Sequence, residues 1–202
     1  MLVRNDQMDE ALASVRQVED RFNGRFGYTW TFLNNEPFLD RFVGMVSGVA
    51  SGRTQFGVIP QATWSLPSFV SKERAEAAIY KAIEASEDEG VPYEATMTFR
   101  HRSRFHAGLF FDHELMKEFE WYWPIEPGML FSCDLPYDLF TFMRTNNKTY
   151  GFTQATYETQ ETLPSLWNET LAFLRGEGGE QRVVVCVGRR CDLPRMPILD
   201  GL

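Results

Sequence analysis

The stretch that decides the fold is Tyr28-Thr29-Trp30-Thr31-Phe32-Leu33-Asn34-Asn35-Glu36-Pro37, in which aromatic and polar residues alternate before a polar turn. Alternation with a period of two is typical of a β-strand, and Asn-Asn-Glu-Pro predicts the end of that strand. A second strand is predicted over residues 55–59, and residues 38–49 between the two have the apolar spacing of a helix. Strand, helix and strand in this order indicate two parallel strands joined by a crossover helix.

The same alternation continues on both sides of this unit. Leu2 and Val3 predict a short strand, and Asn5 or Asp6 can cap the helix that follows. Ser71 is expected to cap a later helix. Two further strands are predicted over residues 95–105 and 121–125, separated by a short helix that Asp112 can cap. The apolar stripes of the two long helices are Met8, Ala11, Leu12, Val15, Val18 and Phe22, and then Ala75, Ala78, Ile79, Ala82 and Ile83. We therefore predict an α/β fold with a mostly parallel sheet flanked by helices, and expect ligands beyond the carboxyl ends of its strands.

Composition excludes some classes of protein. The chain has 202 residues, 28 acidic and 20 basic side chains and a formal net charge of −8, which argues against a nucleic-acid partner. No run approaches the roughly 18 apolar residues of a membrane span. The first residues lack the features of a secretory signal, so neither a span nor a signal is expected in these residues.

The carboxyl-terminal part differs in composition from the rest. Every aromatic residue lies at or before Phe173, and a glycine-rich stretch begins at Arg175. We predict one partial domain over residues 1–173 and a divergent, flexible tail over residues 174–202. An ordinary flexible terminus and a departure from the proper reading frame or exon both account for this change.

Two tripeptides bear on the cellular compartment. Asn147-Lys148-Thr149 and Asn168-Glu169-Thr170 are acceptor sequons for N-glycosylation, which predicts a secretory lumen if they are used. Such tripeptides also occur by chance in cytosolic proteins. The three cysteines are too few for a disulfide framework, and the spacing of Cys186 and Cys191 does not match a zinc knuckle.

Carboxylates gather after the predicted strand 121–125. Glu126 follows that strand directly, and Pro127-Gly128 then turns the chain. A carboxylate there can bind a hard divalent cation that also holds phosphate oxygens, and Asp134 and Asp138 are further acidic candidates. A solvated turn glutamate is the alternative.

Three arginines are expected on one face of the predicted strand 95–105, because side chains of a strand alternate. They are Arg100, Arg102 and Arg104, and a cluster of guanidinium groups in an acidic protein favours phosphate or carboxylate recognition. A surface strand with salt-bridged arginines is the alternative. The same strand would point His101 and His106 to opposite faces, so we expect no metal shared by them.

Several ordered motifs resemble the fungal α-1,2-mannosyltransferases of glycosyltransferase family 15. The matching stretches cover the chain almost continuously from Leu2 to about Phe173. They are Val18–Asn23, Phe32–Phe38, Gly57–Pro60 with Trp64–Pro67, Trp121–Pro127, Tyr137–Phe140, Asn146–Thr153 and Thr162–Trp167.

The resemblance implies a GT-A type, Rossmann-like fold, of which this chain is a truncated part. It also implies a retaining α-1,2-mannosyltransferase that uses GDP-mannose, a mannosyl acceptor and Mn²⁺ in protein glycosylation or mannan synthesis. Family members are type II membrane proteins of the Golgi, whose anchor is not expected in these residues. Glu126 matches the metal-binding glutamate, Arg100 and Arg104 match arginines beside the donor site, and Arg4 and Asp134 are expected to contact substrate.

Departures from the family pattern bear on activity. Phe99 replaces the usual donor-site tyrosine, Pro124 replaces an arginine and Ala107 replaces a serine. The family's histidine metal ligand, its proposed nucleophilic glutamate and its Trp-Gly-Asp motif have no match here, so the catalytic residues are unknown and we expect weak or no activity. A non-catalytic nucleotide-sugar-binding or interaction remnant is one alternative, and an unrelated cytosolic α/β protein is another.

Overall fold

The computed structural model describes residues 1–89, 96–152 and 165–174. The chain divides into two compact units, which are described separately. Unit 1 comprises Met1–Phe119 and Pro124–Asp138, and unit 2 comprises Glu120–Trp123 and Leu139–Leu202. The predicted tail 175–202 lies outside the described residues, so the boundary near residue 173 stays a prediction.

A small parallel sheet lies at the centre of unit 1. Strand β1 (Trp30–Asn34) pairs with β2 (Thr54–Val58), with Phe32 opposite Phe56. Leu2 forms a parallel bridge with Leu33 on the other side of β1, and the Val3 N–H donates to the Leu33 carbonyl at 3.0 Å. The predicted parallel strands at residues 2–3, 28–33 and 55–59 are thereby confirmed, with shifts of one or two residues at their ends.

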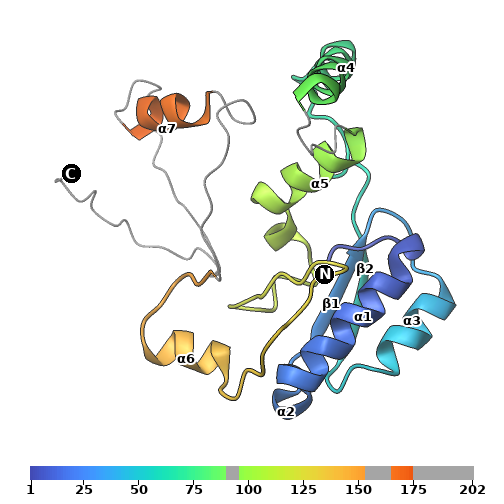
Figure 1. Cartoon of the computed structure of the whole chain (residues 1–202), viewed down its shortest axis with the longest axis vertical. Coiled ribbons are helices and arrows are strands. Elements are labelled where there is room, and N and C mark those ends of the chain that lie inside the picture. Colours follow the sequence, from blue (N-terminus) through green and yellow to red (C-terminus); the bar gives the residue numbers. More distant parts are fainter. Residues whose placement is uncertain (90–95, 153–164, 175–202) are drawn as a thin grey trace. The chain divides into compact units, whose positions relative to one another are not determined.

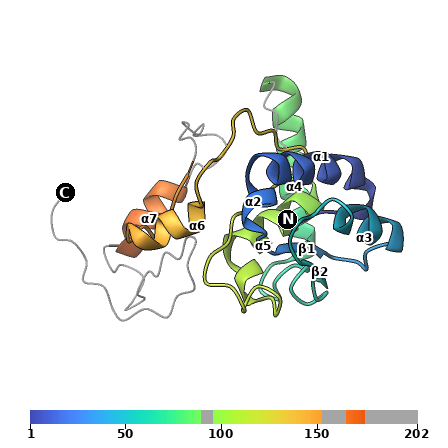
Figure 2. The same cartoon turned by 90° about the horizontal axis from the view of Figure 1, so that it is seen from below.

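Helices α1 (Met8–Val18) and α3 (Asp40–Ser47) lie side by side along the β1–β2 pair (Figures 1 and 2). A π-helical turn (Glu19–Asn23) and the short α2 (Gly24–Phe26) extend α1. The rings of Phe32 and Phe42, both almost wholly buried, meet edge to face with their centroids 6.2 Å apart. The apolar stripe predicted for α1 is buried as well, at Ala11, Leu12, Val15, Val18 and Phe22.

Leu33 belongs to a second apolar cluster, because neighbouring side chains of a strand point to opposite faces. This cluster joins Leu33 to Phe105 of α5 (Met97–Gly108) and also contains Leu2, Ile59 and Trp64. Leu109, Phe110, Leu115 and Met116 pack against it. A Cβ added to Gly57 would lie 2.6 Å from Cε1 of His113. Both faces of β1 are therefore covered.

Residues 95–105 were predicted to form a strand, and this prediction is wrong, because α5 occupies residues 97–108. The Phe99 N–H donates to the Thr96 hydroxyl at 3.1 Å and so begins the helix. The helix directs Phe105 into the core, a packing that the alternation of arginines did not reveal. The prediction for residues 121–125 is also wrong, since they have no strand ladder beyond an isolated bridge at Trp121.

The helix predicted after Ser71 is confirmed as α4 (Lys72–Glu89), and the Arg74 N–H donates to the Ser71 hydroxyl at 3.3 Å. Its predicted stripe is less buried than expected: Ala75 and Ile79 are half-buried and Ala78 is exposed. The side chains of Ala82 and Ile83 lie outside the described residues. The short helix that Asp112 was predicted to cap does not form: Asp112 ends a 3-10 turn (Phe110–Asp112), and turns follow it. The remaining elements are a 3-10 turn (Asn5–Gln7) in unit 1, and α6 (Leu139–Thr145) and α7 (Leu166–Leu174) in unit 2.

Candidate functional site

The carboxyl ends of the parallel strands meet at one edge, because Leu2 lies opposite Leu33 and Asn34 lies opposite Val58. Arg4 follows the first of these strands and is half exposed, with its guanidinium bonded to both carboxylate oxygens of Asp6 at 3.0 and 3.3 Å. These bonds from Arg4 lower the pKa of Asp6 below its usual value. Arg4 therefore lies at this edge of the sheet, where a neighbouring carboxylate already engages it.

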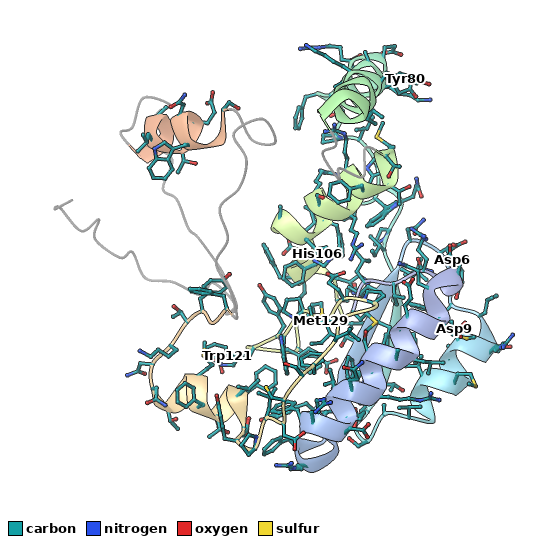
Figure 3. All side chains as sticks on the ribbon, viewed as in Figure 1. Asp6, Asp9, Tyr80, His106, Trp121 and Met129 are labelled. Carbon is teal, nitrogen blue, oxygen red and sulfur yellow. The ribbon has the colours of Figure 1, made fainter. Side chains whose placement is uncertain are left out.

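The segment that carries Glu126 is attached to α1. The Gly128 N–H donates to the Glu10 carbonyl at 3.3 Å, and the Ser14 hydroxyl donates to the Met129 carbonyl at 3.1 Å. Figure 3 shows Met129 beside α1. Gly128 has φ 79°, a left-handed conformation that favours glycine, so the turn after Glu126 depends on this residue.

Glu126 meets two side chains of α5. Its Oε2 forms an ion pair with Nη2 of Arg102, and its Oε1 lies 3.5 Å from Nε2 of His106. Arg102 and His106 are four residues apart and therefore share a face of the helix. About a third of each of the three side chains is exposed, at 34%, 34% and 33% for Arg102, Glu126 and His106. Figure 3 labels His106 on α5.

The charges of this Arg102–His106–Glu126 cluster nearly cancel. Burial, together with the nearby positive charges of the Arg102 guanidinium and the N-terminus, lowers the pKa of His106 to about 4. The imidazole is therefore neutral at pH 7. One guanidinium and one carboxylate remain, and they neutralise each other.

The predicted face of three arginines does not form. In a helix Arg102 lies about 200° around the axis from Arg100, whereas Arg104 lies only about 40° from Arg100. Arg104 donates to the main-chain carbonyls of Thr63 and Ser65, at 3.2 and 2.6 Å. Arg104 thus ties α5 to the loop after β2, and Arg100 beside it is half-buried.

The acidic candidates do not converge either. Asp134 is exposed and lies 3.3 Å from Nη1 of Arg21, while Asp138 accepts a hydrogen bond from the Tyr28 hydroxyl at 2.7 Å. The described parts of the chain hold no group of three or more His, Cys, Asp or Glu side chains suited to a metal ion.

Sequence reasoning missed the contribution of Arg102 and His106 to the surroundings of Glu126. Their spacing of four residues behind Thr96, a good helix-capping residue, was the available signal. A second missed residue is Asn34 at the end of β1, which is 1% exposed. Its Oδ1 accepts from the Asn35 N–H at 2.9 Å, while its Nδ2 has no partner within the described residues.

A separate groove of about 730 Å³ lies between the loop after β2, α4 and the start of α5. Trp64, Tyr80 and His101 are among its lining residues, and burial lowers the pKa of His101. The lining does not include Glu126 or Arg102, so the groove and the cluster are different features.

The profile of the family described as glycolipid 2-alpha-mannosyltransferase, which is glycosyltransferase family 15, matches residues 1–182. The chain belongs to this family. It is 40% identical over 173 residues to alpha-1,2 mannosyltransferase KTR1 of Saccharomyces cerevisiae, covering 86% of this chain and 43% of the relative. It is 39% identical over 174 residues to O-glycoside alpha-1,2-mannosyltransferase omh1 of Schizosaccharomyces pombe, covering 86% of this chain and 44% of the relative.

Two solved structures share the fold of this chain. Core-mannan synthase A of Aspergillus fumigatus, in its Mn/GDP form, matches with a TM-score of 0.81 and 28% identity, over 87% of this chain and 46% of that one. The mannosyltransferase Ktr4p of S. cerevisiae, in complex with GDP, matches with a TM-score of 0.79 and 31% identity, over 86% of this chain and 44% of that one. The expected glycosyltransferase fold is confirmed for the part that matches, and the chain spans less than half the length of these relatives.

The Aspergillus relative was crystallised with manganese, which makes Glu126 the residue to compare with a metal site. Glu126 is the carboxylate that the resemblance assigns to the metal, and its Oε2 is engaged by Arg102. A divalent cation prefers several oxygen ligands and no neighbouring positive charge. The described residues around Glu126 do not fit a divalent metal ion as they stand.

Neither sequon residue is hidden in unit 2. Asn147 follows α6 with an exposed side chain and φ 51°, and Asn168 is exposed on α7. Among the described helices, none combines the length and the apolar character needed to cross a membrane.

Proposed function

We propose that the protein takes part in the transfer of mannose from GDP-mannose to a mannosyl acceptor, with an α-1,2 linkage and retention of configuration. The observation that carries this proposal is the match of nearly the whole chain to the glycosyltransferase fold of two relatives that hold GDP. Membership of the mannosyltransferase family supports mannose as the transferred sugar. The acceptor is a mannosylated glycan or glycoprotein in protein glycosylation or mannan synthesis.

The part of this reaction assigned to the chain is binding of the donor nucleotide at the carboxyl edge of the sheet. Arg4 follows a strand at that edge, and its guanidinium can bind a diphosphate in a bidentate manner once it leaves Asp6. Arg100 and Arg104 are proposed to support the donor site from α5, and Asp134 to contact a sugar or ribose hydroxyl. Manganese is given no role in this binding, because Arg102 engages Glu126.

The activity of these 202 residues alone is expected to be low. The resemblance assigns a histidine metal ligand and a nucleophilic glutamate to motifs that this sequence does not match, and Phe99 lacks the hydroxyl of the usual tyrosine. The compartment proposed from the family is the Golgi lumen, with the exposed Asn147 and Asn168 as glycosylation sites.

Calorimetry with GDP and a mannosyl-transfer assay together test the proposal. We expect heat on titration of GDP into the chain, and a several-fold weaker Kd in Arg4→Gln than in Arg16→Gln. Arg16 is an exposed arginine of α1, so its variant has the same charge change and serves as the control. Absence of GDP binding together with absence of transfer would refute the proposed function.

A second function, a non-catalytic nucleotide-sugar-binding protein, is favoured by one observation. The Glu126 carboxylate is neutralised by Arg102 in the described structure. Binding of GDP with no mannosyl transfer, in an assay where a full-length relative turns over, would support this second function.

A further inference from the structure

We propose that Arg102 is the resident cation of the Glu126 site: its guanidinium occupies the carboxylate oxygen that a divalent metal ion would take, and so excludes the ion. Arg102 Nη2 and Glu126 Oε2 form an ion pair. An arginine is protonated at every accessible pH, so this positive charge is permanent.

Separate elements of the fold hold the two partners of this ion pair in place. Glu126 is placed by the turn at Gly128 and by the hydrogen bonds of the following residues to α1, while Arg102 projects from α5. The Oε2 atom itself is buried, although a third of the Glu126 side chain is exposed. A cation approaching from solvent therefore finds Oε2 covered and the guanidinium in contact with it.

The other oxygen of Glu126 faces a potential metal ligand. His106 Nε2 lies 3.5 Å from Oε1, a separation close to that of two ligands in one coordination sphere, and the imidazole is a common metal ligand. Without the guanidinium, Glu126 and His106 would present one carboxylate and one imidazole to a metal ion. Arg102 is thus the residue that determines whether this pair binds a metal.

The expected magnitude follows from the effect of a guanidinium on a carboxylate. An adjacent arginine lowers the affinity of a carboxylate for a proton by about 10- to 1000-fold. A divalent ion carries twice the charge of a proton, so the guanidinium repels it at least as strongly. We therefore expect Arg102→Gln to raise Mn²⁺ affinity by at least about tenfold.

The test is a titration of Mn²⁺ alone into the full chain. The electron paramagnetic resonance signal of free Mn²⁺ reports how much metal remains unbound. Arg102→Gln should bind at least about tenfold more tightly than the wild type, and Arg102→Gln/Glu126→Gln should lose that gain. Arg53→Gln is the matched control, because it removes the same charge from the ion pair with Glu118, 3.6 Å apart. It should bind Mn²⁺ like the wild type.

Three results would overturn the proposal. They are tight Mn²⁺ binding by the wild type, no detectable binding by Arg102→Gln, and an equal gain in Arg53→Gln, which would assign the effect to net charge. Circular dichroism of each variant verifies the fold before titration.

A second measurement rests on the proposed function. The wild-type affinity for GDP should be equal in Mn²⁺ and in a metal chelator, and should become dependent on Mn²⁺ in Arg102→Gln. Failure of GDP to bind at all contradicts the proposed function and leaves the titration of Mn²⁺ alone to decide the role of Arg102. A wild-type GDP affinity that requires Mn²⁺ would contradict the metal exclusion itself.

Discussion

Glu19 offers the sharpest test of how unit 1 is held together. It is 8% exposed, in the π-helical turn after α1. Its Oε1 accepts hydrogen bonds from Trp30 Nε1 at 2.6 Å and from Asn23 Nδ2 at 2.8 Å. Its Oε2 accepts from the backbone N–H of Ser51 at 3.1 Å and from the Ser51 hydroxyl. One carboxylate therefore joins the end of α1, strand β1 and the loop after α3.

The cost of Glu19→Ala can be worked out donor by donor. The Asn23 amide keeps the Tyr28 carbonyl at 3.0 Å, and the Ser51 hydroxyl keeps the Asn23 carbonyl at 3.0 Å. The Trp30 indole N–H and the Ser51 backbone N–H lose the partner described for each. Trp30 is buried, so its orphaned N–H costs about 1–3 kcal/mol, whereas Ser51 is exposed and its N–H can bind water instead. We therefore expect Glu19→Ala to lower the free energy of unfolding by about 2–3 kcal/mol.

Glu19→Gln separates charge from shape. The amide keeps one carbonyl oxygen for Trp30 but turns an NH₂ group toward the donors of the exposed Ser51, so we expect a smaller loss of about 1 kcal/mol. Asp20→Ala is the control, since Asp20 is the exposed neighbour in the same turn. It should change the free energy of unfolding by less than about 0.5 kcal/mol.

Urea unfolding followed by circular dichroism measures these differences, and a double-mutant cycle with Trp30→Phe isolates one bond. Phenylalanine removes the indole N–H, so its combination with Glu19→Ala should show a coupling of about 1–2 kcal/mol. A loss below about 1 kcal/mol for Glu19→Ala, or no coupling, would refute the reasoning that this carboxylate satisfies buried donors.

Further predictions concern the sheet, α5 and the sequons. Gly57→Ala should cost about 1–3 kcal/mol in urea unfolding, because its Cβ would lie 2.6 Å from His113 Cε1; an unchanged midpoint would contradict the close packing there. Arg104→Met should cost about 1–3 kcal/mol by leaving two carbonyls without their donor, and a GDP affinity that falls without any loss of stability would instead favour direct contact with substrate. In a yeast secretion host, glycosidase treatment should reveal a glycan that Asn147→Gln abolishes and Asn168→Gln retains, because Asn147 lies in an exposed turn and Asn168 lies on a helix; a glycan at Asn168 alone would reverse this order.

Sequence periodicity predicted the fold best where the signal lies within a few neighbouring residues. The strand at Trp30–Asn34, the helix at Asp40–Ser47 and the cap at Ser71 follow from alternation, apolar spacing and turn residues within a few positions. The prediction failed at residues 97–108, where arginine and aromatic residues alternate as in a strand. The helix that forms there buries Phe105 against Leu33 and Trp64, partners 41 or more residues away in the chain, and local pattern contains no information on them.

The motifs by themselves determined the family, the parallel order of the first strands and the candidate Glu126, because each depends on residue identity over short ordered stretches. Only the tertiary structure decided the surroundings of that glutamate. A helix at residues 97–108 turns Arg102 and His106 toward it and turns Arg104 toward main-chain carbonyls, whereas a strand would have grouped the arginines. The ion pair between Arg102 and Glu126 joins residues 24 apart in sequence, so it depends on how α5 and the segment along α1 pack, which spacing alone does not encode.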